Sequence, residues 1–344
     1  MKKTRLLTLL ALSVLPLTAC GTENIKPEEA VEKTIPALMK NTVDTYGESG
    51  CLTVDSKINS LKADITYGDF TGSLNFSGNV TFGLRNMYTT DASQLQIAGV
   101  LKNCNLAVDF TQTGKEKQTY EIKDFSIGAY LSGGNLYLDL SNTSLIDSLT
   151  QIASEYIPSL SPTVIKTFIG NGKFKIENVI TNDRLPLLTK EDLSEEKISE
   201  AIKDVFGYVE DEDLVKIMTL THDKNAKTYN LAFDVKDPAV VNNTYKNTKA
   251  DYKASCTEVN LKVESWTNDK EVFSGGKING DVTVSIGEGE DAGSVKVTTD
   301  SEVTFDLTQY AITNPSFSEF KSNNALIEFI KNLIIGGGLL GGNE

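Results

Sequence analysis

Long stretches of the sequence alternate apolar and polar residues, which is the pattern of antiparallel β-strands with one buried face. In the first half the alternating residues are Leu74, Phe76, Gly78, Val80, Phe82 and Leu84; Leu106, Val108 and Phe110; Phe125, Ile127, Ala129 and Leu131; and Leu136, Leu138 and Leu140. Ser132-Gly133-Gly134-Asn135 favours a tight turn between the last two strands. The pattern therefore predicts a β-meander.

The alternation returns after about residue 251. Its residues are Val259, Leu261 and Val263; Ile278, Gly280, Val282, Val284 and Ile286; Val295 and Val297; and Val303, Phe305 and Leu307. The chain between the two meanders has a mixed pattern. It predicts a strand over 173–180, a helix over 191–206, and a hairpin over 215–235 that turns at 223–226.

Three other segments have the spacing of amphipathic helices. Residues 27–46 repeat apolar side chains at i, i+1, i+4 and i+5, with a kink expected at Pro36. Residues 142–157 and 326–335 have similar stripes, and a glycine-rich tail follows the second. Together the patterns predict an α+β fold, mainly antiparallel β, in which curved meander sheets carry amphipathic helices on one face.

The two meanders share sequence as well as period. Three blocks match in the same order: Phe76–Phe82 with Ile278–Val284, Asp91–Ile97 with Asp291–Val297, and Val108–Gln112 with Phe305–Gln309. The match predicts an internal duplication; the alternative is that strand and turn sequences simply look alike. Two such units could form one curved sheet or two lobes. Gly78 and Gly280, both mid-strand, fit bends or bulges that curve a sheet.

The first residues have the organisation of a secretory signal: Lys2, Lys3 and Arg5, then an apolar run over 6–17 that is too short to span a bilayer. Leu17-Thr18-Ala19-Cys20-Gly21 follows and resembles the lipobox of bacterial lipoproteins. The resemblance implies cleavage between Ala19 and Cys20, and a diacylglycerol or palmitate anchor on Cys20 at the extracytoplasmic face of a cell membrane. In a Gram-negative source this could be the outer membrane. The alternative is an ordinary signal peptide with a chance cysteine.

These observations divide the chain into five segments. We expect a signal peptide (1–19), a lipidated N-terminus and tether (20–26), and a first unit of helix, β-meander and helix (27–157). A mixed segment (158–250) and a second unit of meander, C-terminal helix and glycine-rich tail (251–344) complete the chain.

A lipidated protein with this order of elements resembles the half-barrel carriers of lipids and lipoproteins of the LolA, LolB and LppX type. Their Asp-Gly-x-x-Leu-Trp/Tyr hairpin is similar to Gly133-Gly134-Asn135-Leu136-Tyr137-Leu138-Asp139, although Gly133 replaces the acid. The resemblance implies a concave apolar sheet that holds acyl chains beneath a lid, here the helices over 27–46 and 142–157. The alternative is that these helices close an ordinary packed core.

The composition narrows the possible partners. Lys and Arg number 33 against 47 Asp and Glu, giving a net charge of −14, which is the wrong sign for binding nucleic acid. Removal of residues 1–19 would make the chain still more acidic. An anionic membrane would repel such a body, so attachment would depend on the acyl chains of Cys20.

The sequence offers little for catalysis, and we expect neither an enzyme nor a cofactor. His222, the single histidine, falls at a predicted turn, and Ser194–Lys197 and Ser318–Lys321 fit Ser-x-x-Lys without the other motifs of that hydrolase class. The acidic clusters Glu210–Asp213 and Glu288–Asp291 lack the spacing of a calcium loop, so we expect a helix N-terminus and a solvated turn.

Lipidation of Cys20 would leave three cysteines, Cys51, Cys104 and Cys256, so at most one disulfide could form. Cys104 shares the parity of Leu106 and is expected in the core, whereas Cys51 has the opposite parity to Leu52. Their strands would also be separated by a third. Free thiols are therefore the expectation.

Two functional hypotheses follow. The first is a non-enzymatic, membrane-anchored lipoprotein that binds or carries an apolar, lipid-like ligand. The second is a surface structural or interaction lipoprotein with a packed core and no ligand, whose protein partner is unknown. A cavity lined by the even-numbered side chains of residues 74–84 would favour the first hypothesis. A filled core with a flat exposed apolar patch would favour the second.

Overall fold

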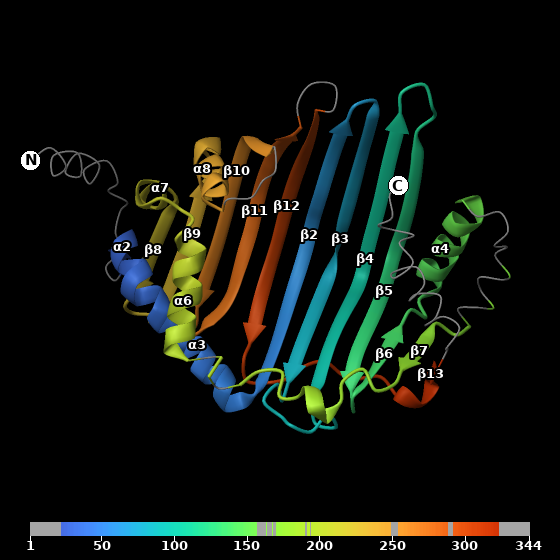
Figure 1. The fold of residues 1–344 in the computed structure, drawn as a ribbon, viewed down its shortest axis with the longest axis horizontal. Coiled ribbons are helices and arrows are strands. Elements are labelled where there is room, and N and C mark those ends of the chain that lie inside the picture. The colour runs from blue at the N-terminus through green and yellow to red at the C-terminus, as the bar shows by residue number, and fades with distance from the viewer. Residues whose placement is uncertain are drawn as a thin grey trace, which may run out of the picture.

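A computed structural model of the chain describes residues 22–156, 163, 167, 170–189, 191–192, 194–248, 254–287 and 292–322. These residues are mostly antiparallel β-structure, with a few helices (Figure 1). The expected helix and tail at 326–344 lie outside the described residues, as do the signal peptide and the lipobox.

The described strands form one curved, open sheet of 13 strands (Figure 1). Their order is β1-β8-β9-β10-β11-β12-β2-β3-β4-β5-β6-β7-β13, and all neighbours are antiparallel except β7 and β13. The strands are β1 (Thr22–Ile25), β2 (Cys51–Tyr67), β3 (Phe70–Arg85), β4 (Gln96–Gln112), β5 (Gln118–Ser132), β6 (Asn135–Asp139), β7 (Lys173–Ile176), β8 (Met218–Asp223), β9 (Thr228–Val235), β10 (Ala254–Thr267), β11 (Phe273–Ile286), β12 (Gly293–Asp306) and β13 (Lys321–Ser322).

The two predicted meanders are confirmed, and they join edge to edge rather than forming two lobes. The last strand of the second meander, β12, pairs with the first strand of the first, β2, from Gly293 opposite Tyr67 to Asp306 opposite Thr53. The predicted turn at 132–135 is also confirmed, with Gly133 and Gly134 at positive φ.

Six described α-helices lie beside the sheet: α2 (Pro27–Glu29), α3 (Ile35–Ser49), α4 (Thr143–Tyr156), α6 (Glu195–Phe206), α7 (Asp211–Ile217) and α8 (Pro238–Asn247). A π-helical turn, Ala30–Thr34, joins α2 to α3, so the irregularity precedes Pro36, which lies in the first turn of α3. Gly50 ends α3 in the left-handed conformation, with φ of 62°, and its N–H bonds to the Tyr46 carbonyl.

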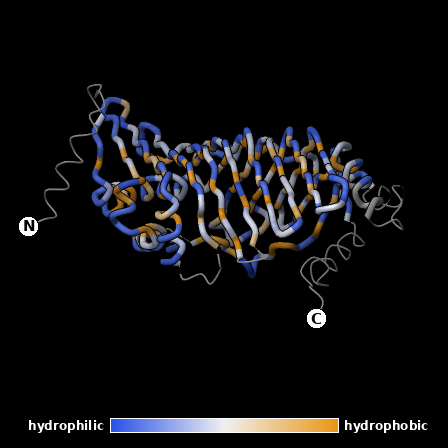
Figure 2. The backbone as a smooth tube through the Cα atoms, turned by 90° about the horizontal axis from the view of Figure 1, so that it is seen from above, coloured by the Kyte–Doolittle hydropathy of each residue, from blue (hydrophilic) through white to orange (hydrophobic). Residues whose placement is uncertain are grey.

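The alternation along each strand sorts side chains onto two faces, visible as alternating colours along the tube in Figure 2. Leu220 and Leu231 project from one face against α3 and α6. Ile122 and Phe125 cluster with Leu145 of α4. We call this face the helical face; it carries most of the apolar residues of both meanders.

The opposite face is polar over most of its area. Where it is apolar, the chain after β12 covers it: Tyr310, Ile312, Phe317 and Phe320 pack against Ala98, Val100, Tyr130 and Tyr137. The Thr53 hydroxyl fixes the start of this segment, because it donates to the Gln309 carbonyl and accepts from the Ala311 N–H.

The mid-strand glycines occupy conformations that other residues avoid. Gly78 in β3 has φ of 154° and Gly280 in β11 has φ of 141°. The register of β3 shifts beside Gly78 on both edges, against β2 and against β4. The bulge expected at Gly78 is therefore present, and both glycines lie within long strands rather than at their ends.

Of the expected tether over 20–26, the structure describes residues 22–26, and most of these are in a strand. Thr22–Ile25 forms strand β1, paired with β8 at the edge of the sheet. Glu23 strengthens this pairing through an ion pair with Lys224, 2.7 Å between Oε2 and Nζ. The edge of the sheet therefore begins two residues after Cys20.

Candidate functional site

An apolar cavity of about 700 Å³ lies between α3, α6 and the helical face of the sheet. Pockets of this size accept drug-sized or lipid-like ligands. Its apolar lining comes from α3 (Ile35, Met39, Val43), α6 (Ile198, Ala201, Ile202, Phe206) and strands or their ends (Leu52, Leu231, Phe273, Phe305, Leu307).

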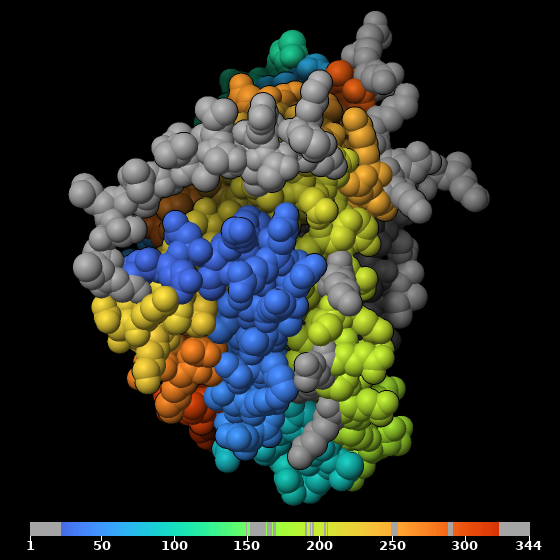
Figure 3. Space-filling model, turned by 90° about the vertical axis from the view of Figure 1, so that its left-hand side faces the viewer, coloured from blue at the N-terminus to red at the C-terminus, as the bar shows by residue number. Residues whose placement is uncertain are grey.

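The two helices reach the cavity because each has one apolar stripe. Ile35, Met39 and Val43 recur every fourth residue along α3, and Ile198 and Ile202 do so along α6. In Figure 3, α2 and α3 (blue) lie next to α6 (yellow-green) across this end of the sheet. The helices thus form a two-part roof over the cavity.

The polar groups of the cavity are already paired. The Thr42 hydroxyl donates to the Leu38 carbonyl and accepts from the Phe273 N–H. The Ser265 hydroxyl donates to the Gly275 carbonyl at 3.1 Å. These bonds leave the walls between roof and sheet apolar, without a nucleophile activated by a neighbouring base.

Two charged residues, Asp192 and Lys197, line the α6 side of the cavity. Lys197 is paired with Glu200, 3.2 Å between Nζ and Oε2. Hydrogen bonds from the Thr189 hydroxyl and N–H lower the pKa of the Asp192 carboxyl, so it stays ionised at neutral pH. Both charges are solvated groups rather than parts of a buried acid–base pair.

The apolar surface continues beyond the roof. Phe305, which lines the cavity, pairs across the sheet with Val54, and Val54 pairs with Phe82. Because cross-strand partners share a face, Phe82 belongs to the same surface, and its side chain is 39% exposed. By the same alternation the exposed side chains of Ile65, Ile278 and Val297 lie on the helical face. We call Ile65, Phe82, Ile278 and Val297 the open strip.

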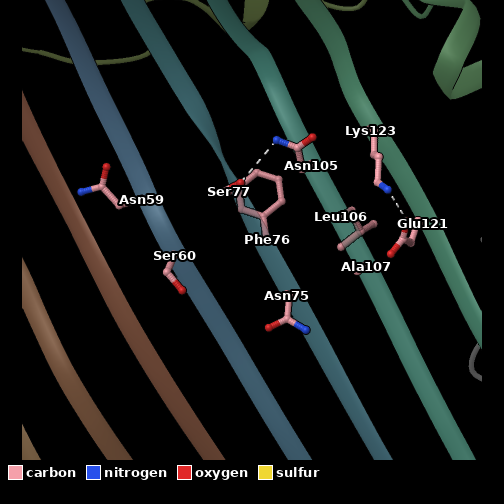
Figure 4. Close-up of a pocket in the computed structure, with 10 residues that line it drawn as sticks. All are labelled: Asn59, Ser60, Asn75, Phe76, Ser77, Asn105, Leu106, Ala107, Glu121 and Lys123. Atoms are coloured by element: carbon pink, nitrogen blue, oxygen red, sulfur yellow. Dashed lines mark hydrogen bonds and ion pairs between the residues drawn. The ribbon is translucent and has the colours of Figure 1, made fainter.

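The opposite face has a shallow groove of about 320 Å³ beside the strand irregularities (Figure 4). Asn105 donates to the Ser77 hydroxyl at 3.4 Å, and Lys123 pairs with Glu121 at 2.6 Å. Asn59 and Asn75 add further amide groups, and Phe76, Leu106 and Ala107 give the groove apolar surface as well. In the part of the chain that the structure describes, no three His, Cys, Asp or Glu side chains gather closely enough to hold a metal ion.

The residues considered as catalytic or metal-binding candidates have ordinary structural contacts where the structure describes them. His222 lies in β8 rather than in the turn, and its ring stacks on Tyr229 with 4.2 Å between centroids. The Ser194 hydroxyl accepts from the Lys197 N–H at the start of α6. Glu210 is the N-cap of α7, as expected for the first acidic cluster. Glu288–Asp291, Ala19 and Cys20 lie outside the described residues.

The three described cysteines are free thiols. Cys104 is fully buried among Ile122, Phe125 and Leu145, as its parity predicts, and burial raises the pKa of its thiol. Cys256 is also buried and Cys51 is half-buried. The strands of Cys51 and Cys104, β2 and β4, are separated by β3.

The location of the cavity differs from the sequence-based expectation. None of the even-numbered side chains of residues 74–84 lines it, and α4 packs on the Cys104 cluster instead of on the cavity. The second half of the roof is α6, which the sequence predicts as a helix but not as a lid. Its stripe of Ile198, Ile202 and Phe206 is the signal that could have identified it.

Comparisons with known proteins relate this chain to no characterised family. No family model matches the sequence, and no curated protein matches it. Among solved structures, a DUF1329 family protein from Desulfovibrio piger aligns with 88% of this chain and 100% of its own, at 11% identity and a TM-score of 0.19. A TM-score this low relates neither the folds nor the functions.

No described helix is both long and apolar enough to cross a lipid bilayer.

Proposed function

We propose that this protein is a membrane-anchored extracytoplasmic lipoprotein that binds or carries an apolar, lipid-like ligand without chemical conversion. The observation that carries the proposal is the apolar cavity of about 700 Å³ beneath α3 and α6. Its polar groups are bonded internally, so a ligand would be held by burial of apolar surface, about 0.8 kcal/mol for each CH₂ group.

The sequence around Cys20 supports the anchored part of the proposal. A lipobox-like cysteine separated by one residue from the edge strand β1 would hold the sheet close to the bilayer. A ligand could then move between membrane and cavity over a short distance.

Titration with the fluorescent apolar probe N-phenylnaphthylamine tests the binding activity. Ala201 lines the cavity on α6 but is itself exposed, so it lies at the mouth. We expect the probe to bind the wild-type protein and Ala201→Trp to weaken binding about fivefold or more by blocking entry. The control Ala226→Trp, in the exposed turn between β8 and β9, should bind as wild type. Equal binding by both variants contradicts a site in this cavity.

A second candidate is a surface interaction lipoprotein, and the open strip favours it. Exposed large apolar side chains such as Phe82 and Ile278 on one face are typical of protein-binding surfaces. In that case Phe82→Ser would abolish association with the partner, while apolar probes would not enter beneath α3.

We also propose that the sheet contains an internal duplication, in which β2–β4 correspond to β10–β12. The matched sequence blocks place Gly78 and Gly280 at equivalent points, and both have positive φ in the middle strand of their unit. Such a pair is unusual in a β-sheet, where glycine generally weakens a strand.

A further inference from the structure

The apolar stripe of α3 continues past the cavity to a tyrosine. Thr42 and Val43 line the cavity, and Tyr46 follows them by four and three residues, so it lies on the same face of the helix. Tyr46 is 8% exposed, and its cluster includes Leu52 and Leu307, two residues that also line the cavity. Tyr46 therefore packs directly behind Leu52 and Leu307, next to the end of the cavity rather than in its lining.

A second tyrosine faces it. Tyr88, in the turn between β3 and β4, places its ring 5.8 Å from that of Tyr46, centroid to centroid. Both phenolic oxygens are buried, and neither has a hydrogen-bond partner among the described residues. Buried hydroxyl groups are nearly always paired because an unpaired one costs free energy, so two of them behind the end of an apolar cavity indicate a place for a polar group of a ligand that reaches past Leu52 and Leu307.

The surroundings define the chemistry of that group. Leu52, Met87, Leu188, Val272 and Leu307 complete the apolar cluster. Among the described residues, no cationic side chain contributes to the pKa shift of either tyrosine. Burial, together with Tyr88 and then Cys51, raises the pKa of Tyr46 to about 12, so both hydroxyls stay neutral and can donate as well as accept. A carboxylate or phosphate here would be buried without a counter-charge, which is unfavourable.

We infer that Tyr46 and Tyr88 bind the head of a long-chain amphiphile whose head group is an uncharged hydroxyl or ester, while its alkyl chain occupies the cavity. This inference rests on the proposed ligand-binding function and names its ligand class. Fatty alcohols and acylglycerols satisfy it, whereas fatty acids at neutral pH and plain alkanes do not.

The test compares dodecanol, dodecane and dodecanoate as competitors of N-phenylnaphthylamine on the full chain. Wild type should bind dodecanol about tenfold more tightly than dodecane or dodecanoate. The double variant Tyr46→Phe, Tyr88→Phe should lose about tenfold affinity for dodecanol and keep that for dodecane. Unchanged dodecane affinity also shows that the variant is folded.

The matched control is Tyr310→Phe, a half-buried tyrosine on the opposite face whose hydroxyl already donates to Asn314 at 3.0 Å. It should bind all three competitors as wild type does. Dodecanol affinity that survives the double substitution would overturn the head-group site while leaving the carrier function intact. Failure of the probe and all competitors to bind wild type would overturn the proposed function itself.

Discussion

Gly280 shows how a single residue permits the close approach of two neighbouring strands. A Cβ atom at this position would lie 1.9 Å from the Asn260 carbonyl oxygen, and the φ of 141° is strained for any L side chain. We expect Gly280→Ala to lower the free energy of unfolding by about 2 kcal/mol or more. Urea unfolding measures this.

Gly99, in β4, is the matched control for that substitution. A Cβ built there meets no atom within 4 Å, and its φ lies outside the positive region. Gly99→Ala should leave stability unchanged or raise it by up to about 1 kcal/mol. If both alanine variants unfold at the same urea concentration, the close approach at Gly280 is not a constraint.

Tyr46, which is buried, and Tyr310, which is half-buried, give stability a dependence on alkaline pH. Burial raises the pKa of both Tyr46 and Tyr310 to about 12, whereas an unfolded tyrosine titrates near 10. From pH 10 to 12 the unfolded chain therefore loses protons that the folded chain keeps, and stability falls as pH rises. Each group contributes up to about 1.4 kcal/mol per pH unit.

Urea unfolding between pH 8 and pH 11.5 tests this dependence. The double variant Tyr46→Phe, Tyr310→Phe should lose less stability above pH 10 than wild type. Below pH 9 the two proteins should give parallel curves. An alkaline loss of the same slope in both proteins would show that other groups cause it.

At the residue scale the sequence predicts backbone better than side-chain contacts. Gly78 and Gly280 were identifiable because a glycine in the middle of an alternating run generally marks a bulge or a bend. Cys104 was placed in the core by parity alone. The pairing of Tyr46 with Tyr88 was not identifiable, because Tyr88 lies in an irregular turn whose position depends on the whole sheet.

Leu38 and Met39 are adjacent in α3, but substitutions at the two positions should have different effects, one on stability and the other on ligand binding. Leu38 is 2% exposed and does not line the cavity, so Leu38→Ala should cost about 2–5 kcal/mol of stability. Met39 is half-buried and lines the cavity. Met39→Ala should cost less stability but weaken binding of N-phenylnaphthylamine several-fold, through lost apolar contact.

Thermal unfolding and probe titration of the two variants provide the comparison. We expect Leu38→Ala to unfold at the lower temperature of the two variants. We expect Met39→Ala to bind the probe more weakly than Leu38→Ala. If Leu38→Ala weakens probe binding more than Met39→Ala while remaining folded, the ligand does not lie beneath this face of α3.

Elements with a regular period were predicted well, and elements defined by their partners were not. The strands of both meanders and the helices α3, α4 and α6 follow from periods of two and 3.6. Strand β1 has four residues and no distinctive period, so the sequence favours a tether there; its pairing with β8 defines it as a strand. Helix α8 was missed although Asp237 caps it and Pro238 begins it.

The whole molecule combines two meanders into one sheet with an apolar face that its described helices cover only in part. Sequence periodicity predicted the meanders but left open whether they pair, because the register of β12 against β2 depends on long-range contacts. The location of the cavity depended on α3 and α6 meeting over the sheet, which local pattern does not determine.

The anchor is testable on the intact cell. Wild-type protein should partition into the detergent phase of a Triton X-114 extract, since an acyl chain on Cys20 would outweigh an acidic body. The variant Cys20→Ala should move to the aqueous phase, whereas Cys51→Ala should partition as wild type does. Detergent partitioning that survives Cys20→Ala would contradict lipidation at this residue.

Native mass spectrometry with lipid extraction tests the central claim most directly. The chain from residue 21, produced without the acyl group, should carry a stoichiometric lipid after purification or after incubation with membrane extract. Ala201→Trp should reduce that bound fraction. An unliganded mass under both conditions would contradict the carrier function and leave an anchored structural or interaction protein.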